Sequence, residues 1–177
     1  MLTACGDDLA GKRDRALVAL GFEGLCRRSE ISALEVTDLI ENMRGGLSVT
    51  IRRGKTDQAG EGRTVGLSPN TAEILRAWID AAELVEGPLI CPVHKGCLVQ
   101  RHMRGFSIAR ILKRVDEQAG FAPDIVAQIS GHSLRVGAAQ SLAIDGRSVL
   151  EIMRVGGWRS ITTVARYIEN AKITVWR

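Results

Sequence analysis

Residues 47–69, LSVTIRRGKTDQAGEGRTVGLSP, predict the β-structure of this chain and the start of a helix behind it. Residues 47–53 alternate in polarity and are rich in β-branched side chains, which is typical of a strand. Residues 54–63 are polar and contain glycine, so they predict a turn, and the return strand of an antiparallel hairpin follows over 64–67. Ser68-Pro69 then predicts a helix start, because serine caps free backbone N–H groups and proline has the φ angle of a first helical turn.

On both sides of this hairpin, apolar residues recur at helical spacing. We expect helices over residues 11–25, 29–39, 68–83, 106–118, 134–144, 149–155 and 162–170, and an irregular connection over 87–104. The strands do not alternate with helices as they do in a βαβ chain. The sequence therefore predicts an α+β fold, mostly helical with a small antiparallel β-hairpin or sheet, in one domain that spans residues 1–177.

Composition indicates a globular protein, and the arginine-rich charge is compatible with a phosphate-bearing partner but does not decide it. The chain has 177 residues, of which 45% are apolar and 25% charged. No apolar run approaches the ~20 residues that cross a bilayer, and no basic-then-apolar leader opens the chain, so we expect a cytoplasmic protein without membrane contact. The net charge of +4 comes from 19 arginines and 5 lysines against 20 acidic residues. Arginine pairs bidentately with phosphate, although a genome rich in G and C would produce the same excess.

Four short stretches carry the candidate functional side chains. They are residues 24–31 (GLCRRSEI), 53–57 (RGKTD), 131–135 (GHSLR) and 156–158 (GGW), the last followed by Tyr167. Taken singly, each has an ordinary structural explanation, such as a solvated charge at a helix start or a half-buried tyrosine. Their order along the chain is more informative than any one of them.

Together, the stretches resemble the tyrosine recombinase (phage integrase) family. Its catalytic domain carries an Arg in an RxSE context, a hairpin Lys, a HxxR helix, a His or Trp, and a nucleophilic Tyr. The matching positions here are Arg27, Lys55, His132, Arg135, Trp158 and Tyr167. Residues 13–17 (RDRAL) and 131–137 (GHSLRVG) match as well, and the resemblance covers residues 8–170. The Trp in place of a His, and its spacing to the Tyr, are similar to the Cre-type branch.

The resemblance implies a tyrosine recombinase (DNA breaking-rejoining enzyme) fold and a site-specific DNA recombinase activity. Such an enzyme cleaves and rejoins double-stranded DNA through a 3′-phosphotyrosine, with no cofactor and no metal. Full-length members of the family assemble as homo-tetramers on DNA and carry an additional N-terminal helical domain. This chain starts almost at the first helix of the catalytic domain, so we expect an isolated catalytic fragment or a truncated gene product. Only ten residues follow Tyr167, so we also expect a shortened C-terminal contact between subunits.

The chemistry of phosphodiester cleavage explains why these residue types occur together. Two arginine forks, on Arg27 and Arg135, would stabilise the charge that accumulates on the non-bridging oxygens. Tyr167 would supply the nucleophilic oxygen, and Lys55 would protonate the departing 5′ oxygen. His132 lies one helical turn before Arg135, on the same face, so both side chains can reach one phosphate.

The remaining candidates have supporting roles. The Trp158 indole N–H can hold a phosphate oxygen while its ring supports the tyrosine helix. The resemblance implies that Glu30 supports the active site, and its alternative is a capping or surface residue. Arg28 and Arg53 are expected to bind the DNA backbone, and Cys26 is expected to pack in the interior.

Several alternatives remain open on the sequence alone. The chain could be a DNA-binding module without strand exchange, or a type IB topoisomerase-like enzyme that relaxes DNA, although the GHSLRVG and GGW segments favour the recombinase. Cys91, His94, Cys97 and His102 have spacings that could bind zinc, but they match no specific zinc motif. Ser133 lacks the second glycine of a G-x-S-x-G nucleophile elbow, which argues against a serine hydrolase.

Overall fold

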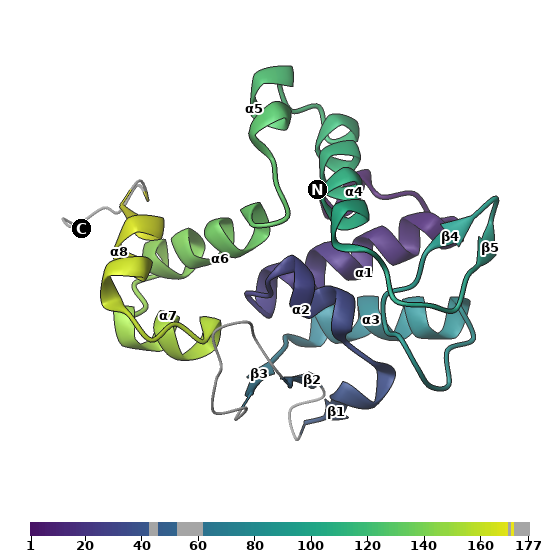
Figure 1. The fold of residues 1–177 in the computed structure, drawn as a ribbon, viewed down its shortest axis with the longest axis horizontal. Coiled ribbons are helices and arrows are strands. Elements are labelled where there is room, and N and C mark those ends of the chain that lie inside the picture. The colour runs from purple at the N-terminus through teal and green to yellow at the C-terminus, as the bar shows by residue number, and fades with distance from the viewer. Residues whose placement is uncertain (43–45, 53–61, 170, 172–177) are drawn as a thin grey trace.

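The computed structural model describes residues 1–42, 46–52, 62–169 and 171, and its ribbon is drawn in Figure 1. The predicted mostly helical α+β fold is confirmed. The helices within these ranges are η1 (Leu2–Ala4), α1 (Leu9–Glu23), α2 (Arg28–Ala33), η2 (Val36–Asp38), α3 (Pro69–Ala81), α4 (Gly105–Gln118), α5 (Pro123–Gln128), α6 (Ser133–Ile144), α7 (Val149–Gly156) and α8 (Ile161–Ile168). The strands are β1 (Leu39–Glu41), β2 (Leu47–Ile51), β3 (Arg63–Gly66), β4 (Val93–His94) and β5 (Cys97–Leu98).

The predicted hairpin is present as β2 and β3, with Val49 opposite Val65. A further strand, β1, pairs antiparallel with the other edge of β2, so the sheet has the order β1-β2-β3. The side chains of β2 alternate between buried and half-buried, as the sequence pattern predicts for a strand with one face on the core. Ser68 caps α3 as expected, because its hydroxyl accepts the N–H of Thr71.

The prediction of one helix over residues 29–39 is wrong in its second half. Helix α2 has only six residues, and Leu34 then adopts extended backbone angles (φ −65°, ψ 140°). The Leu34 carbonyl accepts the N–H of Leu89, and the Val36 N–H donates to the carbonyl of Gly87, both at 2.9 Å. These long-range hydrogen bonds replace those of a continued helix, and the chain proceeds through η2 into β1.

A short hairpin and a helix lie where the sequence predicted no regular structure. Within the predicted irregular connection, β4 and β5 form a short hairpin whose turn residues, Lys95 and Gly96, both have positive φ (50° and 79°). Helix α5 begins with Pro123 and has Asp124 in its first turn. Both are standard start signals, and a sequence argument could have used them.

The apolar residues form two clusters, and the candidate site lies where they meet. The larger cluster is built from α1, the sheet, α3 and α4, with Leu17 and Leu75 fully buried. The smaller cluster is built from α6, α7 and α8, with Ala139 and Val164 at its centre, and Leu25 joins it from the end of α1. Figure 1 shows α6, α7 and α8 together on one side of the molecule, away from α3 and β1. No helix in the described part of the chain is long and apolar enough to span a membrane.

Candidate active site

Arg27 and Glu30 are held together at the start of α2. Arg27 is the N-cap residue, and its backbone N–H donates to Glu30 Oε2 at 2.8 Å. Its side-chain Nη1 donates to Glu30 Oε1 at 2.5 Å. The carboxylate is 3% exposed, so one buried group both caps the helix and fixes a cation. The capping role that the sequence suggested as the alternative for Glu30 is therefore observed, and its support of an active site stays a prediction.

The environment of Glu30 favours its charged form. Burial by itself raises the pKa of this carboxyl, but the hydrogen bonds and charge of Arg63 and the hydrogen bonds of Arg27 outweigh burial, so the pKa lies below its ordinary value. Cys26 stands next to this pair and is buried, as expected for a packing residue, and burial raises the pKa of its thiol to about 12.

Arg135 lies on the first turn of α6 and is completely buried. Its Nη1 donates to the backbone carbonyl of Leu25, and its Nη2 donates to that of Gly156. Its guanidinium carbon lies 3.9 Å from the centroid of the Trp158 ring, a cation–π geometry. Among the described residues, no acceptor binds its Nε. Burial, followed by the charge of Arg27, lowers the pKa of Arg135 to about 10, so it remains a cation at neutral pH.

Tyr167 approaches the same place from α8. Its hydroxyl lies 2.8 Å from Nε2 of His132, the N-cap residue of α6. The Tyr167 ring is tilted against His132 and Trp158, with centroids 5.3 Å and 5.6 Å away. Burial, and then the charges of Arg135 and Arg27, lower the pKa of His132 below its ordinary value. The lowered pKa favours the neutral imidazole, which can accept a hydrogen bond from the tyrosine hydroxyl at Nε2 when its proton is on Nδ1.

A cavity of about 260 Å³ joins these groups. Its wall includes the five described catalytic candidates, Arg27, His132, Arg135, Trp158 and Tyr167. The rest of the wall comes from Gly157, Arg159, Ser160 and Thr163. Three cationic side chains surround one phenol here, so the cavity suits an anion that reacts with a hydroxyl nucleophile.

Of the two residues expected to bind DNA, Arg28 and Arg53, the structure describes only Arg28. Arg28 is exposed and belongs to an adjoining hollow of about 330 Å³, which also includes Arg27 and His132. The aliphatic part of Arg28 packs on Gly131, where an added Cβ would lie 2.8 Å from its Cδ. Lys55 and Arg53 lie outside the described residues, so their predicted roles stay predictions.

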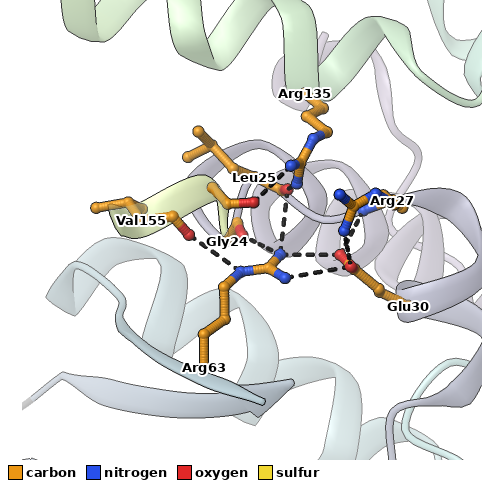
Figure 2. Close-up of polar contacts among 8 residues, drawn as sticks. Gly24, Leu25, Arg27, Glu30, Arg63, Arg135 and Val155 are labelled. Atoms are coloured by element: carbon orange, nitrogen blue, oxygen red, sulfur yellow. Dashed lines mark hydrogen bonds and ion pairs between the residues drawn. The ribbon is translucent and has the colours of Figure 1, made fainter. Parts of the chain in front are cut away.

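Sequence reasoning missed Arg63, the first residue of β3 (Figure 2). Its Nη2 lies 2.8 Å from Glu30 Oε2, and its Nε donates to the backbone carbonyl of Val155 at 3.0 Å. A usable signal was present, because Arg63 is two residues from the buried Val65 and so faces the same side of the strand. An arginine in phase with the core requires partners, and here they are active-site groups.

The four residues of the zinc alternative do not form one group, although His94 and Cys97 are opposite each other in the β4–β5 pair. Cys91 is buried in the larger apolar cluster, Cys97 is exposed on β5, and the ring of His102 bonds to a backbone carbonyl of α2. In the part of the chain that the structure describes, no three His, Cys, Asp or Glu residues form a group that could hold a metal ion.

The curated proteins to which this chain is similar include two recombinases. The chain is 35% identical over 175 residues to an integrase/recombinase xerD homolog from Selenomonas ruminantium, covering 94% of this chain and 50% of that protein. It is 30% identical over 169 residues to the recombinase cre of Escherichia phage P1, covering 89% of this chain and 49% of that protein. The chain therefore spans about half the length of these curated relatives.

Solved structures support the same fold. A XerA recombinase superposes with a TM-score of 0.75 at 18% identity, covering 94% of this chain and 54% of that one. A XerH site-specific recombinase bound to a palindromic difH substrate superposes with a TM-score of 0.76 at 21% identity, covering 97% and 47%. The model of the phage integrase family matches residues 1–173. With nearly its whole length matched, the chain belongs to the phage integrase, or tyrosine recombinase, family.

Proposed function

We propose that this chain is the catalytic domain of a site-specific DNA recombinase, with Tyr167 as its nucleophile. The observation that carries the proposal is the 2.8 Å contact between the Tyr167 hydroxyl and Nε2 of His132, in a cavity that Arg27 and Arg135 also line. A neutral base, a phenol and two guanidinium groups around one space are the parts that phosphoryl transfer to tyrosine requires.

The reaction that we propose uses this arrangement together with Lys55. His132 Nε2 takes the phenolic proton as the tyrosine oxygen attacks phosphorus, and the two arginines stabilise the charge on the non-bridging oxygens. The bond from phosphorus to the 5′ oxygen breaks, its electron pair leaves with that oxygen, and a proton from Lys55 completes the 5′ hydroxyl. A 3′-phosphotyrosine remains, which conserves the phosphodiester linkage. Attack by a 5′ hydroxyl reverses these steps and rejoins the strand, so no cofactor is needed.

The DNA-free site needs an adjustment before it reacts. Each Nη of Arg135 carries two N–H groups, and its hydrogen bond to a backbone carbonyl uses one. Within the described residues, one N–H on each Nη and the Nε are therefore available to a phosphate. Because Arg135 is completely buried, a bound phosphate reaches it only after neighbouring side chains move. We expect Trp158 and Tyr167, whose rings adjoin it, to shift when DNA binds.

The relatives support the partners that we propose. The XerH structure holds a difH substrate, and a lambda integrase dimer is bound to a core site. We propose double-stranded DNA as the substrate, a homo-tetramer of the full-length protein as the assembly, and the cytoplasm as the location. A Trp at position 158 in place of a His, and its spacing to Tyr167, support the proposal of a Cre-like branch. We further propose that residues 1–177 are one catalytic domain, which acts in the family together with an N-terminal DNA-binding domain.

The test is the formation of an SDS-stable DNA adduct. The chain is incubated with a pool of randomised duplexes, each nicked so that the released 5′ fragment diffuses away and cleavage is trapped. At low salt, phosphate contacts are strongest, so DNA binding by residues 1–177 alone is favoured. We expect a 3′-linked adduct from the native chain and none from Tyr167→Phe, which removes only the nucleophilic oxygen.

Two results would contradict the proposal. An adduct that persists in Tyr167→Phe would place the nucleophile elsewhere. DNA binding at low salt without any adduct, from a fully folded chain, would favour the DNA-binding module. Relaxation of supercoiled plasmid, measured in parallel without regard to sequence, would instead indicate a topoisomerase-like activity.

A further inference from the structure

We propose that Arg63 is a positioning residue that holds the two catalytic arginines, Arg27 and Arg135, in one arrangement. This inference rests on the proposed function, because it assigns a role within the same active site. Arg63 does not line the cavity beside Tyr167, so it acts through other groups and not on the substrate. Figure 2 shows it beneath both arginines, with its guanidinium turned toward their acceptors.

The first link runs through Glu30. Arg63 Nη2 lies 2.8 Å from Glu30 Oε2, and its Nη1 lies 3.2 Å from Oε1. Arg27 binds the same carboxylate through its backbone N–H and its Nη1. Arg63 and Arg27 therefore hold one buried anion between them. Without Arg63, Glu30 keeps a single guanidinium partner, and its buried carboxylate loses two charge-assisted hydrogen bonds that help to fix it.

The second link runs through backbone carbonyls that lie next to Arg135. The Leu25 carbonyl accepts from both Arg63 Nη2, at 3.3 Å, and Arg135 Nη1. Arg63 Nε donates to the Val155 carbonyl at 3.0 Å, and the next carbonyl in the chain, that of Gly156, accepts from Arg135 Nη2. The two arginines thus fix the same two backbone segments, which end α1 and α7.

The geometry requires an arginine at this position. The Arg63 side chain is 12% exposed and directs its nitrogens to three segments: the end of α1, the carboxylate of α2 and the end of α7. A planar fork makes these contacts at once, whereas a lysine ammonium is a single point that cannot reach all three. Arg63 also opens β3, the strand that follows residues 53–61, in which Lys55 lies. It therefore connects the sheet to both arginine-bearing helices.

The experiment compares Arg63→Met and Arg63→Lys with a matched control, Arg13→Met. Arg13 is also ion-paired, to Asp14, with a side chain 5% exposed against 12% for Arg63, and it donates to the Cys91 carbonyl, but it does not line the cavity. We expect the single-turnover rate of adduct formation at saturating DNA to fall about 10- to 100-fold in Arg63→Met. The DNA concentration for half-saturation should change less than about threefold, because Arg63 does not touch substrate. Arg63→Lys should recover part of the rate by restoring the pair with Glu30.

Two further measurements complete the test: a double-mutant comparison of Arg63 with Glu30, and an NMR measurement that does not depend on cleavage. If Arg63 acts through Glu30, then Arg63→Met should cost less rate in a Glu30→Gln background than in the native chain. The side-chain Nε–H signals of Arg27 and Arg135 in an NMR spectrum should shift or broaden in Arg63→Met but not in Arg13→Met. These signals report how Arg27 and Arg135 are positioned even if the native chain forms no adduct. A failure of the proposed function can therefore be distinguished from a failure of this inference.

Three outcomes would overturn the inference. The first is a native cleavage rate in Arg63→Met. The second is a rate loss that matches that of Arg13→Met once the folded fractions are equalised. The third is NMR signals of the two catalytic arginines that do not respond to loss of Arg63.

Discussion

Replacing Gly156 with alanine should destabilise the chain, although Gly→Ala in a helix ordinarily stabilises it by up to ~1 kcal/mol. A Cβ on Gly156 would lie 2.0 Å from Cζ3 and 2.2 Å from Cε3 of Trp158. Carbon atoms pack at about 3.5 Å or more, so the ring would have to retreat by roughly 1.5 Å. Such overpacking costs about 1–3 kcal/mol or more. After the propensity gain is subtracted, we expect a net loss of about 1–2 kcal/mol.

Gly137 provides the matched control. It lies inside α6, and the nearest atom to an added Cβ is Cε2 of Phe22 at 3.8 Å, an ordinary contact. Gly137→Ala should therefore raise the melting temperature by about 1–4 °C, whereas Gly156→Ala should lower it by about 2–8 °C in calorimetry. The displaced Trp158 ring also supports Arg135, so adduct formation should slow in Gly156→Ala alone. A Gly156→Ala chain that melts at or above the native temperature would refute the reasoning.

Two pH-dependent effects should follow from the shifted pKa values. The pKa of Glu30 is lowered in the folded chain, so its contribution to stability is present above the ordinary value of 4.5 and is lost as the pH falls through the lowered one. Glu30→Gln should flatten this part of a urea-midpoint profile, and an unchanged acid slope would count against the ion pairs with Arg27 and Arg63. The pKa of His132 is also lowered, so the neutral base persists below the ordinary 6.5, and the acid limb of the adduct rate should lie below that pH. An acid limb above 6.5, or one unchanged in His132→Gln, would exclude His132 as the base.

Local sequence signals predicted those elements whose residue pattern and tertiary contacts favour the same secondary structure. The alternation in residues 47–53 and the Ser68-Pro69 start correspond to β2 and to the capped start of α3. The helix expected over residues 29–39 was wrong after its first turns, because the apolar spacing there fits a helix and an extended segment equally. Hydrogen bonds to residues 87–89, more than fifty positions away, decided between them.

For the candidate site, the sequence likewise indicated which residues take part, and the tertiary structure determined how they contact one another. The order of short motifs identified Arg27, His132, Arg135, Trp158 and Tyr167, and the structure places all five around one cavity. Their identity is local, since each motif can be read within a few residues. The contacts between them are not local, because the Tyr167 hydroxyl meets an imidazole 35 positions earlier in the chain.

The sequence by itself determined the family, the mostly helical α+β class and the candidate residues for phosphoryl transfer to a tyrosine. Only the tertiary structure decided which polar groups share an acceptor. Glu30 binds arginines from two elements, and the Leu25 carbonyl serves Arg63 and Arg135 together. The physical reason is that burying a charge requires partners, and the partners in reach are set by how β3, α2 and α6 pack, not by their spacing along the chain.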